Sequence, residues 1–152
     1  MMTKTQVLLQ LWIEARTRFS NQLQSLSEKD LLKKLQPSNN SVGFLIRHIG
    51  DVELLFAKNV FGDETVNVTA KTVIAQRDTN EWTVLGDLLR YANNSFDVLK
   101  TIIERQSDSD WETMITTKEF GTKTKAEALG RIISHTAYHA GQLAMISKYG
   151  SF

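Results

Sequence analysis

Four segments of the chain repeat their apolar residues at intervals of three and four, and this periodicity constrains the fold more than any other feature. The segments span residues 5–26, 42–60, 80–106 and 124–148. An α-helix has 3.6 residues per turn, so residues at these intervals lie on one face and can be buried together. Alternation typical of strands is scarce. The pattern therefore predicts an all-α protein built from four long amphipathic helices.

Each expected helix has its own set of apolar positions. These are Leu8, Leu11, Trp12, Ala15, Phe19 and Leu23; Val42, Leu45, Ile49, Val52 and Phe56; Trp82, Leu85, Leu89, Ala92, Phe96, Leu99 and Ile103; and Ala128 and Ile132 beside the histidines of the last segment. Thr124 followed by Glu127 has the spacing of a capping box, which predicts the start of the last helix. Ser27 with Asp30 predicts a further helical turn. Asp78 or Thr79 can cap the third helix.

Two connections are too long for tight helix hairpins. Residues 63–77 are rich in threonine and valine and predict no regular element beyond a crossover connection, although a short strand at 66–68 is compatible with them. Residues 107–121 are polar, with an extended piece expected near 114–117. We therefore expect a four-helix bundle with long crossover connections, formed by residues 1–152 as a single domain.

Composition restricts the function classes. The 18 basic residues nearly balance the 17 acidic ones and no long run of like charge occurs, so we expect neither a nucleic acid nor a membrane as partner. The N-terminal residues lack the apolar core of a signal peptide, so a cytoplasmic protein is expected. With no cysteine, metal-ligand chemistry is restricted to imidazole and carboxylate groups.

The three histidines are the strongest candidates for a functional site. His135 and His139 are four residues apart in an expected helix, so both rings project from one face, separated by a rise of about 6 Å. Neutral imidazoles bind zinc, nickel and other transition metals, but two ligands are too few for a stable site. His48 lies in another expected helix and can supply a third. The alternative is that these histidines are hydrogen-bonded residues of the core.

In Ser41 to Asp51 and in the run from His135 to Gln142, the chain resembles the DinB/YfiT-like metalloenzyme superfamily. Members share a lone histidine in the second helix and a His-x3-His-x-Gly-Gln run in the fourth. The resemblance implies a DinB-like four-helix bundle in which His48, His135 and His139 bind zinc or nickel. It also implies a homodimer, because relatives often form one. One departure is Ala140, where relatives often have arginine.

Two function hypotheses remain open at this point. The first is a metal-dependent enzyme acting on a small-molecule substrate, either a hydrolase or a transferase that uses a low-molecular-weight thiol; the resemblance alone suggests the thiol. The second is a non-catalytic metal-binding protein of the stress response. Asp51 is the better placed candidate for an acid or base, and the alternative favoured for it is an exposed surface charge. Gln142 either orients a ligand or is a polar residue near the end of the bundle. Gly141 predicts a close approach by another helix or chain.

Overall fold

The bundle consists of four long helices, α1 (Lys4–Leu23), α2 (Val42–Asn59), α4 (Leu85–Glu104) and α5 (Lys125–Tyr149). The computed structural model describes all 152 residues. The connections hold a short helix, α3 (Lys71–Ala75), and a hairpin of β1 (Met114–Thr117) and β2 (Gly121–Thr124). Two 3₁₀ turns, Glu28–Leu32 and Asp110–Glu112, complete the secondary structure. The predicted all-α class is confirmed, and no helix combines the length and hydropathy needed to cross a bilayer.

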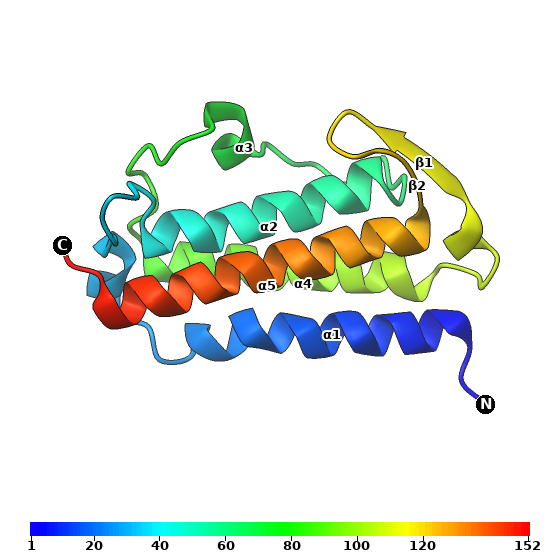
Figure 1. Ribbon diagram of the computed structural model, residues 1–152, viewed down its shortest axis with the longest axis horizontal. Coiled ribbons are helices and arrows are strands. Elements are labelled where there is room, and N and C mark those ends of the chain that lie inside the picture. Colours follow the sequence, from blue (N-terminus) through cyan, green and yellow to red (C-terminus); the bar gives the residue numbers. More distant parts are fainter.

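The helices are arranged so that α1 packs on α5, α5 on α2, α2 on α4, and α4 on α1. In Figure 1, α1 and α5 run in one direction while α2 and α4 run in the other. Since α2 and α4 are parallel neighbours, residues 60–84 return along the length of the bundle. This confirms the expected crossover, and it lays α3 beside α2.

The helix starts agree with the sequence in part. Both capping boxes form, at Ser27 with Asp30 and at Thr124 with Glu127. The third long helix, however, begins at Leu85, later than expected, and has no side-chain cap. Asp78 does not cap it. Its Oδ2 instead accepts hydrogen bonds from the backbone N–H (2.9 Å) and the hydroxyl (2.6 Å) of Ser41, the N-cap residue of α2.

The irregular segments also differ from expectation in part. The extended piece at residues 114–117 is confirmed and pairs with β2 in an antiparallel hairpin. The strand considered at residues 66–68 does not form. Leu11 was wrongly assigned to the core, because 55% of its surface is exposed. A three- or four-residue spacing identifies a stripe but not where its edge lies.

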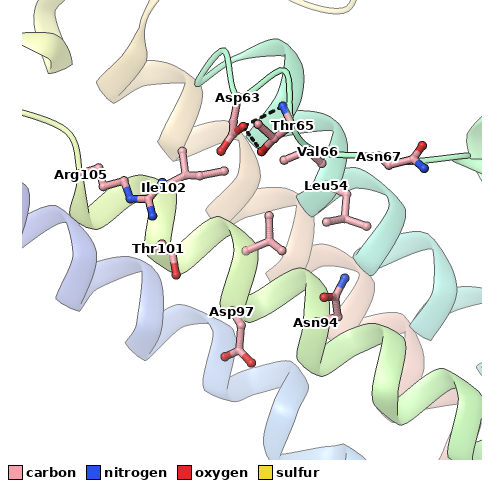
Figure 2. Close-up of a pocket in the computed structure, with 11 residues that line it drawn as sticks. Leu54, Asp63, Thr65, Val66, Asn67, Asn94, Asp97, Thr101, Ile102 and Arg105 are labelled. Atoms are coloured by element: carbon pink, nitrogen blue, oxygen red, sulfur yellow. Dashed lines mark hydrogen bonds between the residues drawn. The ribbon is translucent and has the colours of Figure 1, made fainter.

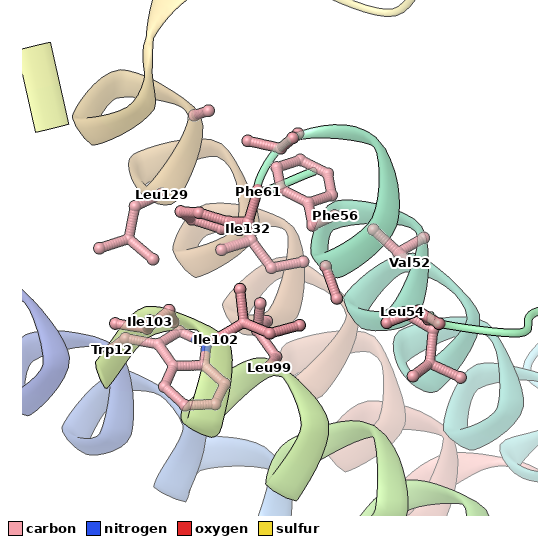
Figure 3. Packing of buried hydrophobic residues seen from close by; sticks show 14 of the residues in the cluster. Trp12, Val52, Leu54, Phe56, Phe61, Leu99, Ile102, Ile103, Leu129 and Ile132 are labelled. Atoms are coloured by element: carbon pink, nitrogen blue, oxygen red, sulfur yellow. The ribbon is translucent and has the colours of Figure 1, made fainter. Parts of the chain in front are cut away.

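The buried apolar side chains form two clusters, one at each end of the bundle. Figure 3 shows the first, around Trp12, Leu99 and Ile132; the second includes Phe19, Leu45 and Leu143. Between them lies a layer of buried polar residues, and we call it the polar layer. Its members are Arg16, Asp51, Glu53, Ser95 and Thr136. The candidate histidines belong to the same level of α2 and α5.

Candidate metal centre

The fold brings all three histidines together. His48 comes from α2, while His135 and His139 come from successive turns of α5. One ring nitrogen of each lies within 4.8 Å of the other two. The ring centroids are 5.0 Å apart for His48 and His135, 4.8 Å for His48 and His139, and 4.5 Å for the α5 pair. The packing of α2 against α5 thus completes the cluster begun by the helical spacing.

The local packing of His48 is set by its own helix. Phe44, one turn earlier on α2, stacks on the His48 ring with the centroids 5.6 Å apart and the planes inclined by 7°. On α5, Tyr138 meets the His139 ring edge-on at 5.1 Å. These aromatic contacts restrict the two imidazoles to a small range of orientations.

The protonated nitrogen of His48 follows from its hydrogen bonds. Thr72 donates its hydroxyl proton to Asp51 Oδ2, with the oxygens 2.7 Å apart. The same Thr72 oxygen lies 3.0 Å from His48 Nδ1. A hydroxyl has one proton, and a carboxylate only accepts, so the Thr72 oxygen accepts from His48 Nδ1–H. His48 Nε2 therefore carries a lone pair and no proton, and it can accept a hydrogen bond from Nε2–H of His135.

His139 is oriented in a similar way by its own helix. Its Nδ1 lies 2.7 Å from Gln142 Oε1, an acceptor, so Nδ1 carries the proton and Nε2 is the nitrogen left free. This contact supports the interpretation of Gln142 as a residue that orients a ligand. His135 differs, because its buried Nδ1 has no hydrogen-bond partner.

The geometry fits a transition-metal ion. Nε2 of His48 and Nε2 of His135 are 3.1 Å apart. Imidazole nitrogens bind zinc at about 2.0–2.1 Å, so two ligands of one ion lie roughly 2.9–3.4 Å apart at angles of about 90–109°. The lone pair of His48 Nε2 thus faces a second imidazole nitrogen at a separation that suits either a hydrogen bond or a shared ion. The role of these histidines as ligands stays a prediction.

Burial keeps the cluster uncharged at neutral pH. The pKa of His48 is lowered to about 4 and that of His135 to about 3, mainly by burial and, to a smaller extent, by the neighbouring His139. Burial also lowers the pKa of His139, while its bond to Gln142 opposes the change. Neutral imidazole is the form that binds metal, so protons compete only weakly for these nitrogens near pH 7.

Asp51 is not an exposed charge but a buried, hydrogen-bonded carboxylate. It is fully buried, and its two oxygens accept four hydrogen bonds. Arg47 Nε and the Tyr91 hydroxyl bind Oδ1 at 2.8 and 2.5 Å, while Thr72 binds Oδ2 through both its N–H and its hydroxyl. The interpretation of Asp51 as an exposed surface charge was therefore wrong, while a role as acid or base stays a prediction. Spacing placed it near His48, but only the fold shows that it bonds to Thr72, whose hydroxyl in turn contacts His48.

The structure also bears on the two residues that follow His139. Ala140 is almost fully buried in the core, so a cation at this position would enter an apolar environment. The expected close approach at Gly141 is absent within the chain, because an added Cβ there would meet no atom within 4 Å.

A cavity of about 560 Å³ lies beside the cluster along α5. Gln142, which binds His139, is part of its wall, and none of the lining residues is charged. The rest of the lining comprises Leu35, Gln36, Pro37, Ser38, Asn40, Leu45, Gly141, Met145 and Ile146. The cavity can therefore accommodate an uncharged part of a small molecule next to Gln142, the residue that links it to His139.

A second cavity, of about 460 Å³, is more polar. Like the first cavity, it has no histidine in its lining, and it also lacks any residue that bonds to one of them. Figure 2 shows it between α4 and the loop that follows α2. Asp63 is engaged there by the N–H and hydroxyl of Thr65, which lowers the pKa of its carboxyl group. Asp97 and Arg105 are exposed. This cavity therefore lacks the buried, converging groups found at the histidine cluster.

Sequence reasoning missed Thr72 and Tyr91. Thr72 follows His48 by 24 residues in a segment without periodicity, and Tyr91 lies 40 residues beyond Asp51 on another helix. No local pattern in the sequence links either residue to the histidines. The nearest signal was the threonine content of the segment that contains Thr72.

Comparisons with known proteins agree with this architecture. The family model described as the DinB superfamily matches residues 11–143. A crystal structure of mycothiol-dependent maleylpyruvate isomerase is similar, with a TM-score of 0.68 and 19% identity over 94% of this chain and 63% of that chain. A histidine-to-alanine mutant of that isomerase has a TM-score of 0.66 at 18% identity, with the same coverage. The chain thus spans less than two thirds of the isomerase, and the likeness shows the fold alone. No curated protein matches the sequence.

Proposed function

This chain belongs to the DinB superfamily, and from that premise we propose that it is a metal-dependent enzyme that works with a low-molecular-weight thiol. The convergence of His48, His135 and His139, with two Nε2 atoms 3.1 Å apart, carries the proposal. Three imidazole ligands leave a coordination position open, as in catalytic sites, whereas structural zinc sites commonly use four protein ligands.

We propose one divalent ion per chain, zinc or nickel, because imidazole nitrogens suit both. When bound, it would lower the pKa of a thiol or water molecule in the open position. The protein's contribution is to keep the three imidazoles neutral by burial. Thr72 and Gln142 hold protons on the Nδ1 atoms of His48 and His139, so that their Nε2 atoms remain free.

The thiol must come from outside the chain, because the sequence contains no cysteine. The structural similarity to a mycothiol-dependent isomerase supports a thiol as cosubstrate. In the proposed transfer, the thiol sulfur bonds to an electrophilic carbon of the substrate, the leaving group departs with its electron pair, and the thiol proton passes to solvent. A hydrolase would use the same ligands with water as the nucleophile.

The substrate is proposed to be a small molecule with an uncharged portion. The cavity of about 560 Å³ beside Gln142 has the volume of a small-ligand site and no charged residue in its wall. An electrophile seated there would lie along α5 beside Gln142, which bonds to His139. A non-catalytic metal-binding protein needs the same three ligands but no such cavity.

Metal titration tests the ligand set. Purified protein should bind one equivalent of zinc or nickel in titration calorimetry, and each of His48→Ala, His135→Ala and His139→Ala should lose most of this affinity. Arg131→Ala, at an exposed position one turn before His135, is the matched control and should bind like the wild type. Circular dichroism should show that all variants keep their helices. Full affinity in all three histidine variants would refute the site.

A second assay separates an enzyme from a metal-binding protein. Metal-loaded protein should accelerate the consumption of mycothiol, or of another low-molecular-weight thiol, by a panel of uncharged electrophiles. His139→Ala should not. Stoichiometric metal binding without acceleration over the whole panel, and without hydrolysis of ester substrates, would favour the non-catalytic alternative.

We further propose that the chain forms a homodimer through the outer face of α5. Tyr138 and Met145 are 65% and 51% exposed, and Gly141 lies between them. A second copy would cover these apolar side chains. Light scattering should give about twice the chain mass of 17.2 kDa, and a single species of that chain mass at high concentration would contradict the proposal.

A further inference from the structure

Thr72 is held in one position by a single buried carboxylate. Its backbone N–H donates to Asp51 Oδ2 at 3.0 Å, and its hydroxyl donates to the same oxygen at 2.7 Å. Only 2% of the Thr72 surface is exposed. The main chain and the hydroxyl direction of Thr72 are therefore both determined by Asp51, although Thr72 belongs to the connection between α2 and α4.

Asp51 is also held by hydrogen bonds from residues of α2 and α4. Its Oδ1 accepts from Arg47 on α2 and Tyr91 on α4. The Arg47 guanidinium lies 3.9 Å from the centroid of the Tyr91 ring, and its Nη2 donates to the Thr69 carbonyl at 3.0 Å. Three elements thus meet at this carboxylate. With four donors around it, the carboxylate has little freedom to turn away from Thr72.

A helical glycine makes room for this arrangement. At Gly50, an added Cβ would lie 2.8 Å from the Tyr91 ring. Glycine costs about 1 kcal/mol relative to alanine inside a helix. Glycine at position 50 therefore lets the Tyr91 ring lie against α2, close enough for the Tyr91 hydroxyl to reach Asp51, the next residue of the helix.

We propose that Thr72, fixed by Asp51, is a positioning residue that sets the tautomer and ring orientation of His48. The proposal rests on the metal-binding function proposed above. Metal-binding histidines commonly donate their second N–H to a carboxylate, a backbone carbonyl or water. Here the Thr72 hydroxyl donates to the Asp51 carboxylate and accepts from His48 Nδ1–H, and we call these two linked hydrogen bonds the relay. The relay keeps Nε2 of His48 unprotonated and directed at His135.

The three histidines differ in what holds them. His139 is oriented by Gln142 within its own helix, and His135 has no partner at Nδ1. His48 alone depends on a residue outside the four long helices. Through the relay, the orientation of His48 in the proposed metal site therefore depends on how residues 60–84 pack against α2.

Replacing one hydroxyl tests the relay. Thr72→Val keeps the shape and the backbone bond to Asp51 but removes the hydroxyl, so zinc affinity in titration calorimetry should fall about 10- to 100-fold. Thr72→Ser retains the hydroxyl and should bind zinc nearly as the wild type does. Thr136→Val is the matched control, because this buried threonine hydroxyl has no hydrogen-bond partner; it should leave zinc affinity unchanged.

A readout without metal separates this inference from the proposed function. Nitrogen-15 NMR of the metal-free wild type should show His48 protonated at Nδ1, and Thr72→Val should shift it toward the Nε2–H tautomer. Absence of zinc and nickel binding in the wild type would refute the proposed function while leaving the tautomer result as a test of the relay. Wild-type affinity together with an unchanged His48 tautomer in Thr72→Val would overturn the inference.

Discussion

The buried ion pair in the polar layer allows a quantitative test of how this bundle is stabilised. Glu53 is fully buried and accepts three hydrogen bonds, from Arg16 Nε at 2.7 Å, Arg16 Nη2 at 2.9 Å and the Ser95 hydroxyl at 3.0 Å. Only 4% of the Arg16 surface is exposed. Its guanidinium also donates to the Ala92 carbonyl and lies over the rings of Phe19 and Phe96.

Glu53→Leu removes the carboxylate and nearly conserves volume, so the Arg16 charge stays buried without a counter-ion. Leaving one member of a buried pair uncompensated costs about 3–5 kcal/mol. This is a large part of the roughly 5–15 kcal/mol that holds a typical domain folded. For a chain of this length, the unfolding temperature should drop by roughly 6–20 °C. Urea unfolding followed by circular dichroism measures the loss directly.

The double variant Arg16→Met with Glu53→Leu is the control for this reasoning. It removes both charges together, and replacing a buried pair by apolar residues of similar size is often neutral or stabilising. The double variant should therefore be more stable than Glu53→Leu alone. A loss below about 1 kcal/mol for the single variant, or losses that simply add in the double variant, would refute the argument that desolvation of Arg16 dominates.

Three further predictions concern glycine positions, a buried indole and pH. Gly141→Ala should raise the free energy of unfolding by up to about 1 kcal/mol, because the added Cβ would meet no atom within 4 Å. Gly50→Ala should lower the free energy of unfolding, because its Cβ would clash with the Tyr91 ring. Urea unfolding compares the two variants, and equal effects would contradict the packing argument. Thr5→Val should lower the free energy of unfolding by about 1–3 kcal/mol, because Trp111 Nε1 loses the hydroxyl that accepts its hydrogen bond at 2.7 Å. Unfolding followed by tryptophan fluorescence measures this loss of stability, and an unchanged free energy of unfolding would contradict the prediction. Since burial lowers the pKa of two site histidines to about 4 and 3, the unfolded metal-free chain binds more protons than the folded one below about pH 6.5. Stability should therefore be highest above that pH and fall as the pH drops toward 4, by up to about 1.4 kcal/mol per pH unit for each histidine. A urea midpoint that stays constant between pH 6.5 and 5, where few carboxyl groups titrate, would contradict this.

The fold was largely predictable because helix formation and capping are local. The stripe of Val42, Leu45, Ile49, Val52 and Phe56 is buried throughout, and the capping box at Thr124 starts α5 as expected. Prediction failed where a side chain had a more distant partner. Asp78 caps no nearby helix because its carboxylate binds Ser41, 37 residues away.

In the candidate site, too, local features were predictable from the sequence and contacts with distant residues were not. The chelate spacing of His135 and His139 is a property of one helix and can be read from five consecutive residues of the sequence. The interpretation of Asp51 as an exposed charge was wrong because a helical spacing does not show what another element places against that face. Its partners Thr72 and Tyr91 are 21 and 40 residues distant.

By itself, the sequence determined four amphipathic helices, their approximate ends, the absence of thiol ligands, and two imidazoles on one face of α5. Only the tertiary structure decided that α2 and α5 pack so that His48 Nε2 meets His135, and that Thr72 holds the opposite nitrogen. It also decided that Arg16 and Glu53 are paired in a buried layer between two apolar clusters. The physical reason is that backbone geometry sets the position of side chains within a helix over a few residues. Contacts between helices and irregular connections depend instead on how all the apolar faces are buried at once.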